Sequence, residues 1–165
     1  MLVIKSVSSR NCLAGARMDE QKLNSLLKNV PNYQGSFAAN ELNQVKISDQ
    51  NLIVINFDER EDQGSHWIGL KIDLKYVYIC DSLGGIAPTK YQPQGLIYFL
   101  YLLSRTRNVV MTKQLQPIDS SRCGFYAVTF IREMSNGSFE DFLRLFTDNY
   151  RQNDEIVRFL TRVYK

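Results

Sequence analysis

The chain is short of histidine and cysteine. Among its 165 residues there is one histidine, His66, and there are three cysteines, Cys12, Cys80 and Cys123. An odd number of widely separated cysteines does not indicate a disulfide framework and is more typical of a protein in a reducing compartment. We therefore expect a protein that is not secreted.

Three further absences exclude classes of site. The cysteines and the histidine show no Cys-x-x-Cys or His-x-x-x-His spacing, so we expect no metal site. The glycine pair Gly84-Gly85 lacks the lysine and the spacing of a phosphate-binding loop. No apolar run reaches the roughly 18–20 residues of a membrane-spanning helix, so we expect no membrane partner.

The bulk composition is that of a globular domain. Hydrophobic residues make up 44% of the chain and charged residues 22%, which is ordinary for a folded protein. A chain of this length can bury a substantial core, and we expect one monomeric domain over residues 1–165. The formal net charge of +3 is too small to indicate a nucleic-acid or membrane partner by itself.

Basic residues gather near the C-terminus: Arg144, Arg151, Arg158, Arg162 and Lys165. The last three recur at helical spacing. A solvated helix face is the more common explanation of such a pattern, and a stripe that faces a polyanion is the alternative. In the alternative, DNA would bind weakly through Arg151, Arg158, Arg162 and Lys165.

Apolar periodicity and breaker residues predict the secondary structure. Helices are expected over 18–28, 94–104, 123–134 and 152–164, with one more from Phe139 capped by Ser138. Strands are expected over 52–57, 66–72, 76–80 and 108–112, whereas 33–40 and 58–65 are expected to be loops. Strands in the middle and helices at the ends indicate an α+β fold with a central mixed or antiparallel sheet flanked by helices.

The strands at 66–72 and 76–80 predict a hairpin that brings two polar residues together. With a turn at Asp73 and Leu74, His66 lies directly opposite Asp81 on a face that is otherwise apolar. A three-residue loop would set Asp81 beside Trp67 and mix the two faces, so the pattern disfavours it. Opposed Cβ atoms lie roughly 4.5–5.5 Å apart, which suits a carboxylate that holds an imidazole N–H. A strand-end histidine with an incidental aspartate is the other interpretation, and it stays open here.

Cys123 stands where a polar stretch runs into an apolar helix. A thiol at a helix N-terminus feels the positive end of the helix dipole, which lowers its pKa. Gly124 follows and allows close approach of a substrate, and an imidazole, which must be that of His66, would stabilise the thiolate further. The alternative is a small buried apolar residue, a role that suits Cys12 and Cys80 better.

Three motifs occur in order: Gly64-Ser65-His66-Trp67, then Asp81-Ser82-Leu83-Gly84-Gly85, then Gln116-Pro117-Ile118-Asp119-Ser120-Ser121-Arg122-Cys123-Gly124-Phe125. Together they resemble the adenain family of adenovirus endopeptidases and, more broadly, the superfamily that adenain shares with SUMO-specific proteases. That family has His-Trp, an acidic residue after the next strand, and a glutamine six or seven residues before Cys-Gly. The resemblance covers roughly residues 52–134 and implies a papain-like cysteine protease architecture of the adenain type.

The resemblance implies a cysteine endopeptidase that works through an acyl-enzyme. Cys123 would attack the scissile carbonyl after His66 takes its proton, and Asp81 would fix the imidazole tautomer. The side-chain amide of Gln116 and the backbone N–H of Cys123 would form the oxyanion hole.

The same resemblance implies how a protein substrate would be bound. Trp67 would flank the cleft and favour a narrow, glycine-containing scissile segment, with ordinary core packing as its alternative role. Gly124 would lie beside the substrate.

The sequence departs from adenain at two points. Asp81 stands where adenain has glutamate, as in the SUMO-protease branch. No cysteine occurs from 82 to 122, which excludes there the disulfide through which adenain binds an activating viral peptide. We therefore expect no resident cofactor, and DNA or a peptide held without that disulfide are the activators that the resemblance leaves open.

Three functions fit these observations. The first is a viral maturation protease that cleaves capsid or core precursors near glycine-containing sites, in the host nucleus or cytoplasm and in the virion. The second is a protease for ubiquitin-like modifiers, which shares the chemistry. The third is an inactive fold that binds peptides, which the filled catalytic positions disfavour.

Overall fold

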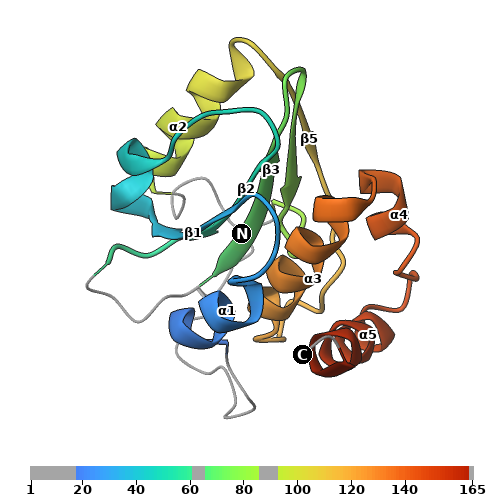
Figure 1. The fold of residues 1–165 in the computed structure, drawn as a ribbon. Coiled ribbons are helices and arrows are strands. Elements are labelled where there is room, and N and C mark those ends of the chain that lie inside the picture. Colours follow the sequence, from blue (N-terminus) through green and yellow to red (C-terminus); the bar gives the residue numbers. More distant parts are fainter. Residues whose placement is uncertain (1–17, 61–65, 86–92, 164–165) are drawn as a thin grey trace, which may run out of the picture.

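A five-stranded sheet forms the centre of the molecule (Figure 1). The computed structural model describes residues 18–60, 66–85 and 93–163. The strands, which lie in the order of the sequence, are β1 (Tyr33–Ala38), β2 (Asn51–Asn56), β3 (Trp67–Ile72), β4 (Tyr76–Cys80) and β5 (Asn108–Met111). β2–β3 and β3–β4 are antiparallel, whereas the edge strands β1 and β5 run parallel to β2 and β4. The sheet is therefore mixed.

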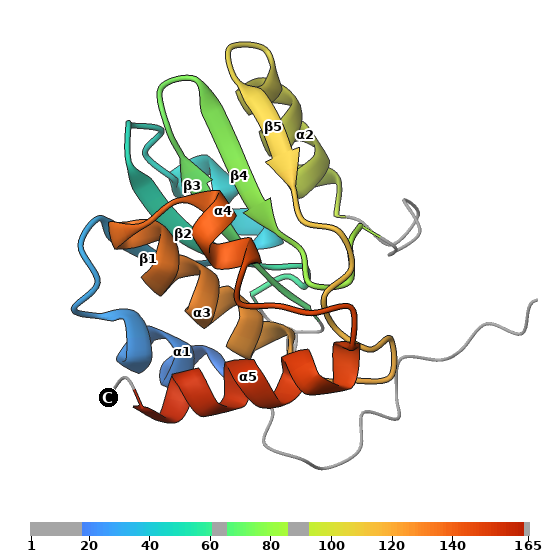
Figure 2. The same cartoon turned by 90° about the vertical axis from the view of Figure 1, so that its right-hand side faces the viewer.

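Helices cover both faces of this sheet (Figures 1 and 2). One face carries α1 (Glu20–Leu27), α3 (Cys123–Asn136), α4 (Phe139–Leu143) and α5 (Tyr150–Val163), and the other carries the 3-10 helix η1 (Ala39–Gln44) and α2 (Gln94–Ser104). In Figure 2, α3 lies in front of the strands and α2 behind them. The predicted α+β class, a mixed sheet flanked by helices, is confirmed.

The side chains of the central strands alternate between two cores. Leu52 and Val54 of β2 pack in the core on the α3 side, and Ile53 and Ile55 pack in the core on the α2 side. All residues of β2 are buried, which explains the nearly continuous apolar run in its sequence, because the strand is covered on both faces.

The predicted helices and all four predicted strands are present. α2 and α3 begin at the predicted residues, and α4 begins at Phe139 behind the N-cap Ser138, whose side chain accepts a hydrogen bond from the N–H of Asp141. The loop prediction for 33–40 is wrong, because this segment contains β1. Its sequence shows no apolar alternation, and Gly35, at φ 134°, interrupts its register with β2. The expected loop at 58–65 lies partly outside the described residues.

The β3–β4 hairpin has the predicted faces but another register. Ile72 pairs with Val77, where the sequence predicted a pairing with Lys75. A backbone hydrogen bond of 2.8 Å from the N–H of Asp73 to the carbonyl of Tyr76 closes the turn one residue later than expected. The shift is two residues, and because side chains alternate with a period of two, every side chain keeps its face.

This shift corrects the predicted position of the candidate pair. The last hairpin pairing is Gly69 with Cys80, and continuing it by one step would set Ile68 across from Asp81. His66 and Asp81 are therefore diagonal neighbours on one face and do not lie directly opposite each other. Diagonal positions are separated by roughly 7–8 Å between Cα atoms, within reach of a long side chain.

Candidate active site

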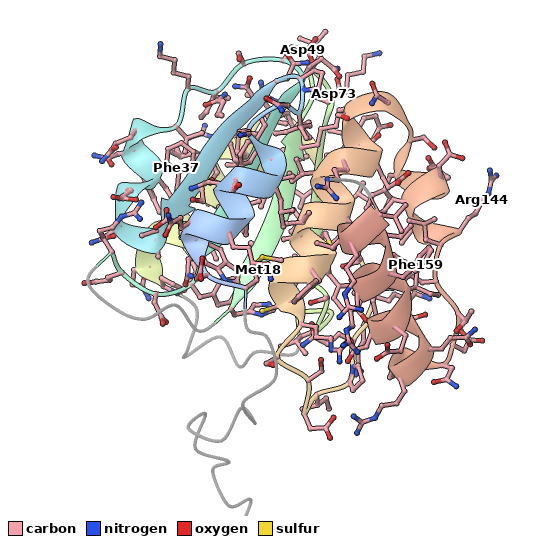
Figure 3. All side chains as sticks on the ribbon, turned by 60° about the horizontal axis from the view of Figure 1, so that its bottom comes forward. Met18, Phe37, Asp49, Asp73, Arg144 and Phe159 are labelled. Atoms are coloured by element: carbon pink, nitrogen blue, oxygen red, sulfur yellow. The ribbon has the colours of Figure 1, made fainter. Side chains whose placement is uncertain are left out.

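Three segments of the chain meet at one end of the neighbouring strands β3 and β4. His66 comes directly before β3 and Asp81 directly after β4, and in an antiparallel pair the start of one strand lies beside the end of the other. Cys123 is the first residue of α3. In Figure 3, Met18 lies close to this end of α3, and Asp73, next to the hairpin turn, lies at the opposite end of the molecule.

The imidazole of His66 and the carboxylate of Asp81 are hydrogen-bonded. Nε2 of His66 lies 2.8 Å from Oδ1 of Asp81, and the two side chains are only 9% and 4% exposed. Asp81 also accepts the N–H groups of Leu83, at 3.0 Å to Oδ1, and Gly85, at 3.2 Å to Oδ2. Burial raises the pKa of Asp81, but the hydrogen bonds and the charge of His66 lower it overall.

The ionised carboxylate fixes the tautomer of His66. A carboxylate without a proton can only accept, so Nε2 of His66 must carry the hydrogen. Nδ1 is then the ring nitrogen that remains for Cys123, to which His66 is also hydrogen-bonded. This division of the two ring nitrogens is what a general base with an orienting carboxylate requires.

The surroundings of Cys123 favour the thiolate. Burial raises the pKa of the thiol, but the hydrogen bond and positive charge of His66, together with the backbone N–H groups of Trp67 and Gly124, lower it below its ordinary value. The position of the sulfur at the first residue of α3 adds the positive end of the helix dipole.

The same contacts favour the protonated imidazole. Burial lowers the pKa of His66, but the hydrogen bonds to Asp81 and Cys123 and the charges of these two groups raise it to about 10. Both shifts favour an imidazolium–thiolate pair.

Phe57 holds the imidazole from the side of β2, a contact that the sequence interpretation missed. Its ring meets that of His66 edge to face, with centroids 4.9 Å apart and an angle of 88°. The backbone N–H of Phe57 donates to the carbonyl of His66 at 3.0 Å. A predicted register between the 52–57 strand and the hairpin would have indicated this neighbour.

Gln116 is buried beside the segment that leads to Cys123. Its side-chain Nε2 donates to the carbonyl of Ser120 at 2.7 Å, and its Oε1 accepts from the hydroxyl of Ser82, also at 2.7 Å. The residue is 1% exposed. The structure therefore gives Gln116 a fixed side chain, while its role at an oxyanion remains a prediction.

Trp67 and Gly124 lie together under the N-terminal part of the described chain. The indole N–H of Trp67 donates to the carbonyl of Met18 at 3.1 Å, and Trp67 is part of the core on the α3 side. A Cβ added to Gly124 would lie 2.4 Å from Cβ of Met18 and 3.3 Å from Cδ1 of Trp67. The core-packing role of Trp67 is thus observed, and the space beside Gly124 is filled by Met18. Their contacts with substrate stay predictions.

The loop of residues 115–122, which leads to Cys123, is bound at both ends by hydrogen bonds that involve helix α5 and Tyr126 of α3. The amide of Asn153 donates to the carbonyl of Leu115 at 3.0 Å, and the hydroxyl oxygen of Tyr126 lies 3.2 Å from the same carbonyl. The one hydrogen of that hydroxyl is donated to Oδ1 of Asp154 at 2.9 Å, and Nη1 of Arg122 donates to the carbonyl of Asp154 at 3.3 Å. Asn153 and Asp154 of α5 are buried, and no pattern in the sequence indicates these contacts between distant segments.

Cys80 is not suited to the role of nucleophile. Cys80 is fully buried, and this burial, with the charges of Asp81 and Cys123, raises the pKa of its thiol well above its ordinary value. Cys12 lies outside the described residues.

Within the described ranges, no three His, Cys, Asp or Glu side chains are close enough to hold a metal ion, and no helix there has the length and apolar content to cross a membrane.

The basic residues of the C-terminal region are in part engaged with acidic side chains. Arg151 pairs with Asp119 at 2.7 Å and Arg158 with Glu155 at 3.5 Å. Arg144 pairs with Asp141 at 3.1 Å, and its side chain is 78% exposed (Figure 3). Lys165 lies outside the described residues. These pairs fit the solvated-face interpretation of the pattern.

Comparison with known proteins shows similarity of structure without similarity of sequence. No family model and no curated protein sequence matches this chain. The central domain of the uncharacterized Lpg1148 protein from Legionella pneumophila is similar in fold, with a TM-score of 0.56, 12% identity, and coverage of 91% of this chain and 98% of that one.

Two solved proteases are more distant. The ASFV pS273R protease matches with a TM-score of 0.46 and 19% identity over 70% of this chain and 44% of its own. The SUMO protease Ulp1, with its catalytic cysteine oxidized to a sulfenic acid, matches with a TM-score of 0.44 and 15% identity over 88% of this chain and 74% of its own. Both TM-scores lie below 0.5.

Proposed function

We propose that this protein is a cysteine endopeptidase in which Cys123 is the nucleophile, His66 the general base and Asp81 its orienting partner. The observation that carries the proposal is the chain of contacts from Oδ1 of Asp81 to Nε2 of His66, at 2.8 Å, and from His66 to the thiol. A buried thiol with a lowered pKa beside an imidazole is an arrangement that favours covalent catalysis.

The proposed reaction follows from these contacts. The sulfur of Cys123 attacks the scissile carbonyl carbon, and the electron pair of the carbonyl moves to its oxygen. His66 then gives its proton to the leaving amine as the C–N bond breaks, which leaves a thioester on Cys123. Water, deprotonated by His66, attacks this thioester and releases the acid and the free thiol.

The oxyanion that forms in both steps needs donors. The backbone N–H of Cys123 at the start of α3 and the amide of Gln116 are the proposed donors, each worth about 3–4 kcal/mol in related chemistry. The bond from Gln116 to the carbonyl of Ser120 uses one of the two amide hydrogens. The other is left for the oxyanion.

A peptide-library cleavage profile tests the activity. Purified protein should cleave a defined subset of peptides, Cys123→Ala should cleave none, and Cys80→Ala should match the parent because its thiol is buried away from the imidazole. Iodoacetamide should inactivate the enzyme and EDTA should not. Equal cleavage by Cys123→Ala, or inactivation by EDTA, would overturn the proposal. A peptide-binding module without activity would bind peptides and cleave none of them.

The proposed substrates are proteins, and the sequence motifs favour viral capsid or core precursors with glycine-containing sites. The alternative is a ubiquitin-like modifier. A ubiquitin-like probe with a C-terminal electrophile separates the two, because rapid adduct formation on Cys123 would support the modifier and count against maturation. Slow or absent adduct formation, with cleavage of glycine-containing peptides, would support the precursors.

Weak DNA binding to the basic face of α5 is a further proposal. Of the four residues expected to bind DNA, Arg162 is exposed, Arg151 and Arg158 form ion pairs, and Lys165 lies outside the described residues. Binding of a fluorescent duplex should fall steeply between about 50 and 200 mM salt, because phosphate contacts release counterions. Affinity that does not change with salt would exclude this proposal.

A further inference from the structure

Ser82 lies between the acidic residue Asp81, its neighbour in the chain, and Gln116, the predicted oxyanion donor. It follows Asp81 directly and is fully buried. Its hydroxyl donates to Oε1 of Gln116 at 2.7 Å. Its carbonyl accepts the backbone N–H groups of Leu115 at 2.8 Å and Gln116 at 3.0 Å. One residue thus holds both the backbone and the side chain of Gln116.

The chemistry of the partners fixes which way the amide of Gln116 points. A backbone carbonyl can only accept a hydrogen bond, so the atom of Gln116 that faces the carbonyl of Ser120, at 2.7 Å, must be Nε2. The atom that faces Ser82 is then Oε1, and the hydroxyl of Ser82 must be the donor. The two bonds together hold the amide against a turn that would exchange Nε2 and Oε1 and present an oxygen, which would repel a substrate oxyanion, in place of an N–H.

We infer that Ser82 is a positioning residue, whose hydroxyl orients the amide of Gln116 so that an N–H faces the oxyanion of the acyl intermediates. The inference rests on the proposed function, because an oxyanion forms only if Cys123 attacks a carbonyl. The two residues that directly follow β4 would then have separate roles. Asp81 orients the base through its side chain, and the next residue orients the oxyanion donor.

This role is separable from that of the neighbouring Asp81. The carboxylate of Asp81 contacts His66, Leu83 and Gly85, and the hydroxyl of Ser82 donates to Gln116. Removing the hydroxyl should therefore disturb the stabilisation of the oxyanion and leave the thiolate of Cys123 as it was. Two reactions at the same sulfur distinguish these effects.

The first reaction is acylation by p-nitrophenyl acetate, which passes through a tetrahedral oxyanion. The second is alkylation by iodoacetamide, which displaces iodide and forms no oxyanion. For Ser82→Ala we expect the acylation rate to fall about tenfold or more, as for loss or misdirection of one oxyanion donor. The alkylation rate of Cys123 and its dependence on pH should be unchanged.

A matched control and a double-mutant cycle complete the test. Ser135→Ala removes a hydroxyl that donates to a backbone carbonyl at 2.8 Å in the last turn of α3, and it should change neither rate. In a Gln116→Ala background, Ser82→Ala should have no further effect on acylation, because the two residues act as one unit. If Ser82→Ala folds poorly in thermal unfolding, Ser82→Cys fills the same space with a much weaker donor and should show the same selective loss.

Each outcome has a defined meaning. Unchanged acylation in Ser82→Ala or Ser82→Cys, an equal loss in the Gln116→Ala background, or a parallel loss of alkylation would overturn the role of Ser82. The proposed function fails separately, if p-nitrophenyl acetate acylates Cys123→Ala as fast as the parent protein.

Discussion

His66 reaches Asp81 along a diagonal across the open end of the β3–β4 hairpin, with 2.8 Å between Nε2 and Oδ1. The diagonal matters because it directs one ring nitrogen to the carboxylate and leaves the other for Cys123 at the start of α3. Phe57 closes one side of the ring. The orientation of the base is thus set by three elements, β2, β3 and β4.

Replacement of the carboxylate tests this orientation. In Asp81→Asn the amide can donate to Nε2, so the imidazole can adopt the tautomer that carries its hydrogen on Nδ1 and cannot accept a proton from the thiol. We expect kcat to fall roughly 10³–10⁴-fold with little change in KM, by analogy with a comparable change in a serine protease triad. Steady-state hydrolysis of the best library peptide measures both constants.

Asp49→Asn is the matched control for that substitution. Asp49 is exposed and lies far from Met18 and the candidate site (Figure 3). It should leave kcat and KM unchanged. A kcat for Asp81→Asn within threefold of the parent value would show that the carboxylate does not orient the base.

The activity should remain high into the alkaline range. The pKa of His66 is raised to about 10 and that of Cys123 is lowered, so the imidazolium–thiolate pair is lost at high pH when His66 loses its proton and at low pH when the thiolate is protonated. The profile of kcat/KM against pH should therefore decline on its alkaline side near pH 10. Asp81→Asn removes a cause of the raised pKa and should move this decline to lower pH. A decline of the parent enzyme centred near pH 7 would contradict the pairing.

The sequence predicts the faces of the hairpin but not its exact pairing. Alternation of apolar residues has a period of two, so a shift of two residues leaves every side chain on its face and cannot be detected from the pattern. The position of the turn sets the register. Asp73 pairs with Tyr76 and does not lie within the turn. The contact of His66 with Asp81 was foreseen in spite of this, because both side chains remain at the same end of the same face.

Other features of the site depend on contacts between distant segments. Met18 fills the space beside Gly124, and Asn153 of α5 binds the carbonyl of Leu115. No local pattern connects these positions, since propensity and periodicity describe neighbours along the chain. The position of Cys123 at a helix N-terminus was predicted correctly because it is a local property of that segment.

The close approach of β3 to α3 predicts a stability effect at Gly69. A Cβ at this position would lie 2.6 Å from Cδ1 of Phe130, so Gly69→Ala overpacks a buried contact and should lower the free energy of unfolding by about 1–3 kcal/mol. Urea denaturation measures the change. In a Phe130→Leu background the penalty should shrink, because the smaller side chain leaves room. Equal penalties in both backgrounds would contradict the clash.

The attachment of α5 predicts a contrast between two adjacent acidic residues. Asp154 is buried and accepts from Tyr126, so Asp154→Ala leaves a buried hydroxyl without this acceptor and should cost about 1–3 kcal/mol. Glu155 is 63% exposed in its pair with Arg122, and Glu155→Ala should cost less than about 1 kcal/mol. Thermal unfolding of both variants gives the comparison, and equal losses would contradict the buried network.

The central claim is that His66 keeps Cys123 as a reactive thiolate at neutral pH and below. The most direct measurement is the rate of iodoacetamide alkylation at pH 6, with the modified cysteine identified by peptide mapping. An ordinary thiol with a pKa of about 8.5 is less than about 1% ionised at this pH. We predict rapid modification of Cys123 in preference to Cys80, and a loss of this rate of at least tenfold in His66→Ala. A parent protein that reacts at pH 6 no faster than His66→Ala would contradict the account.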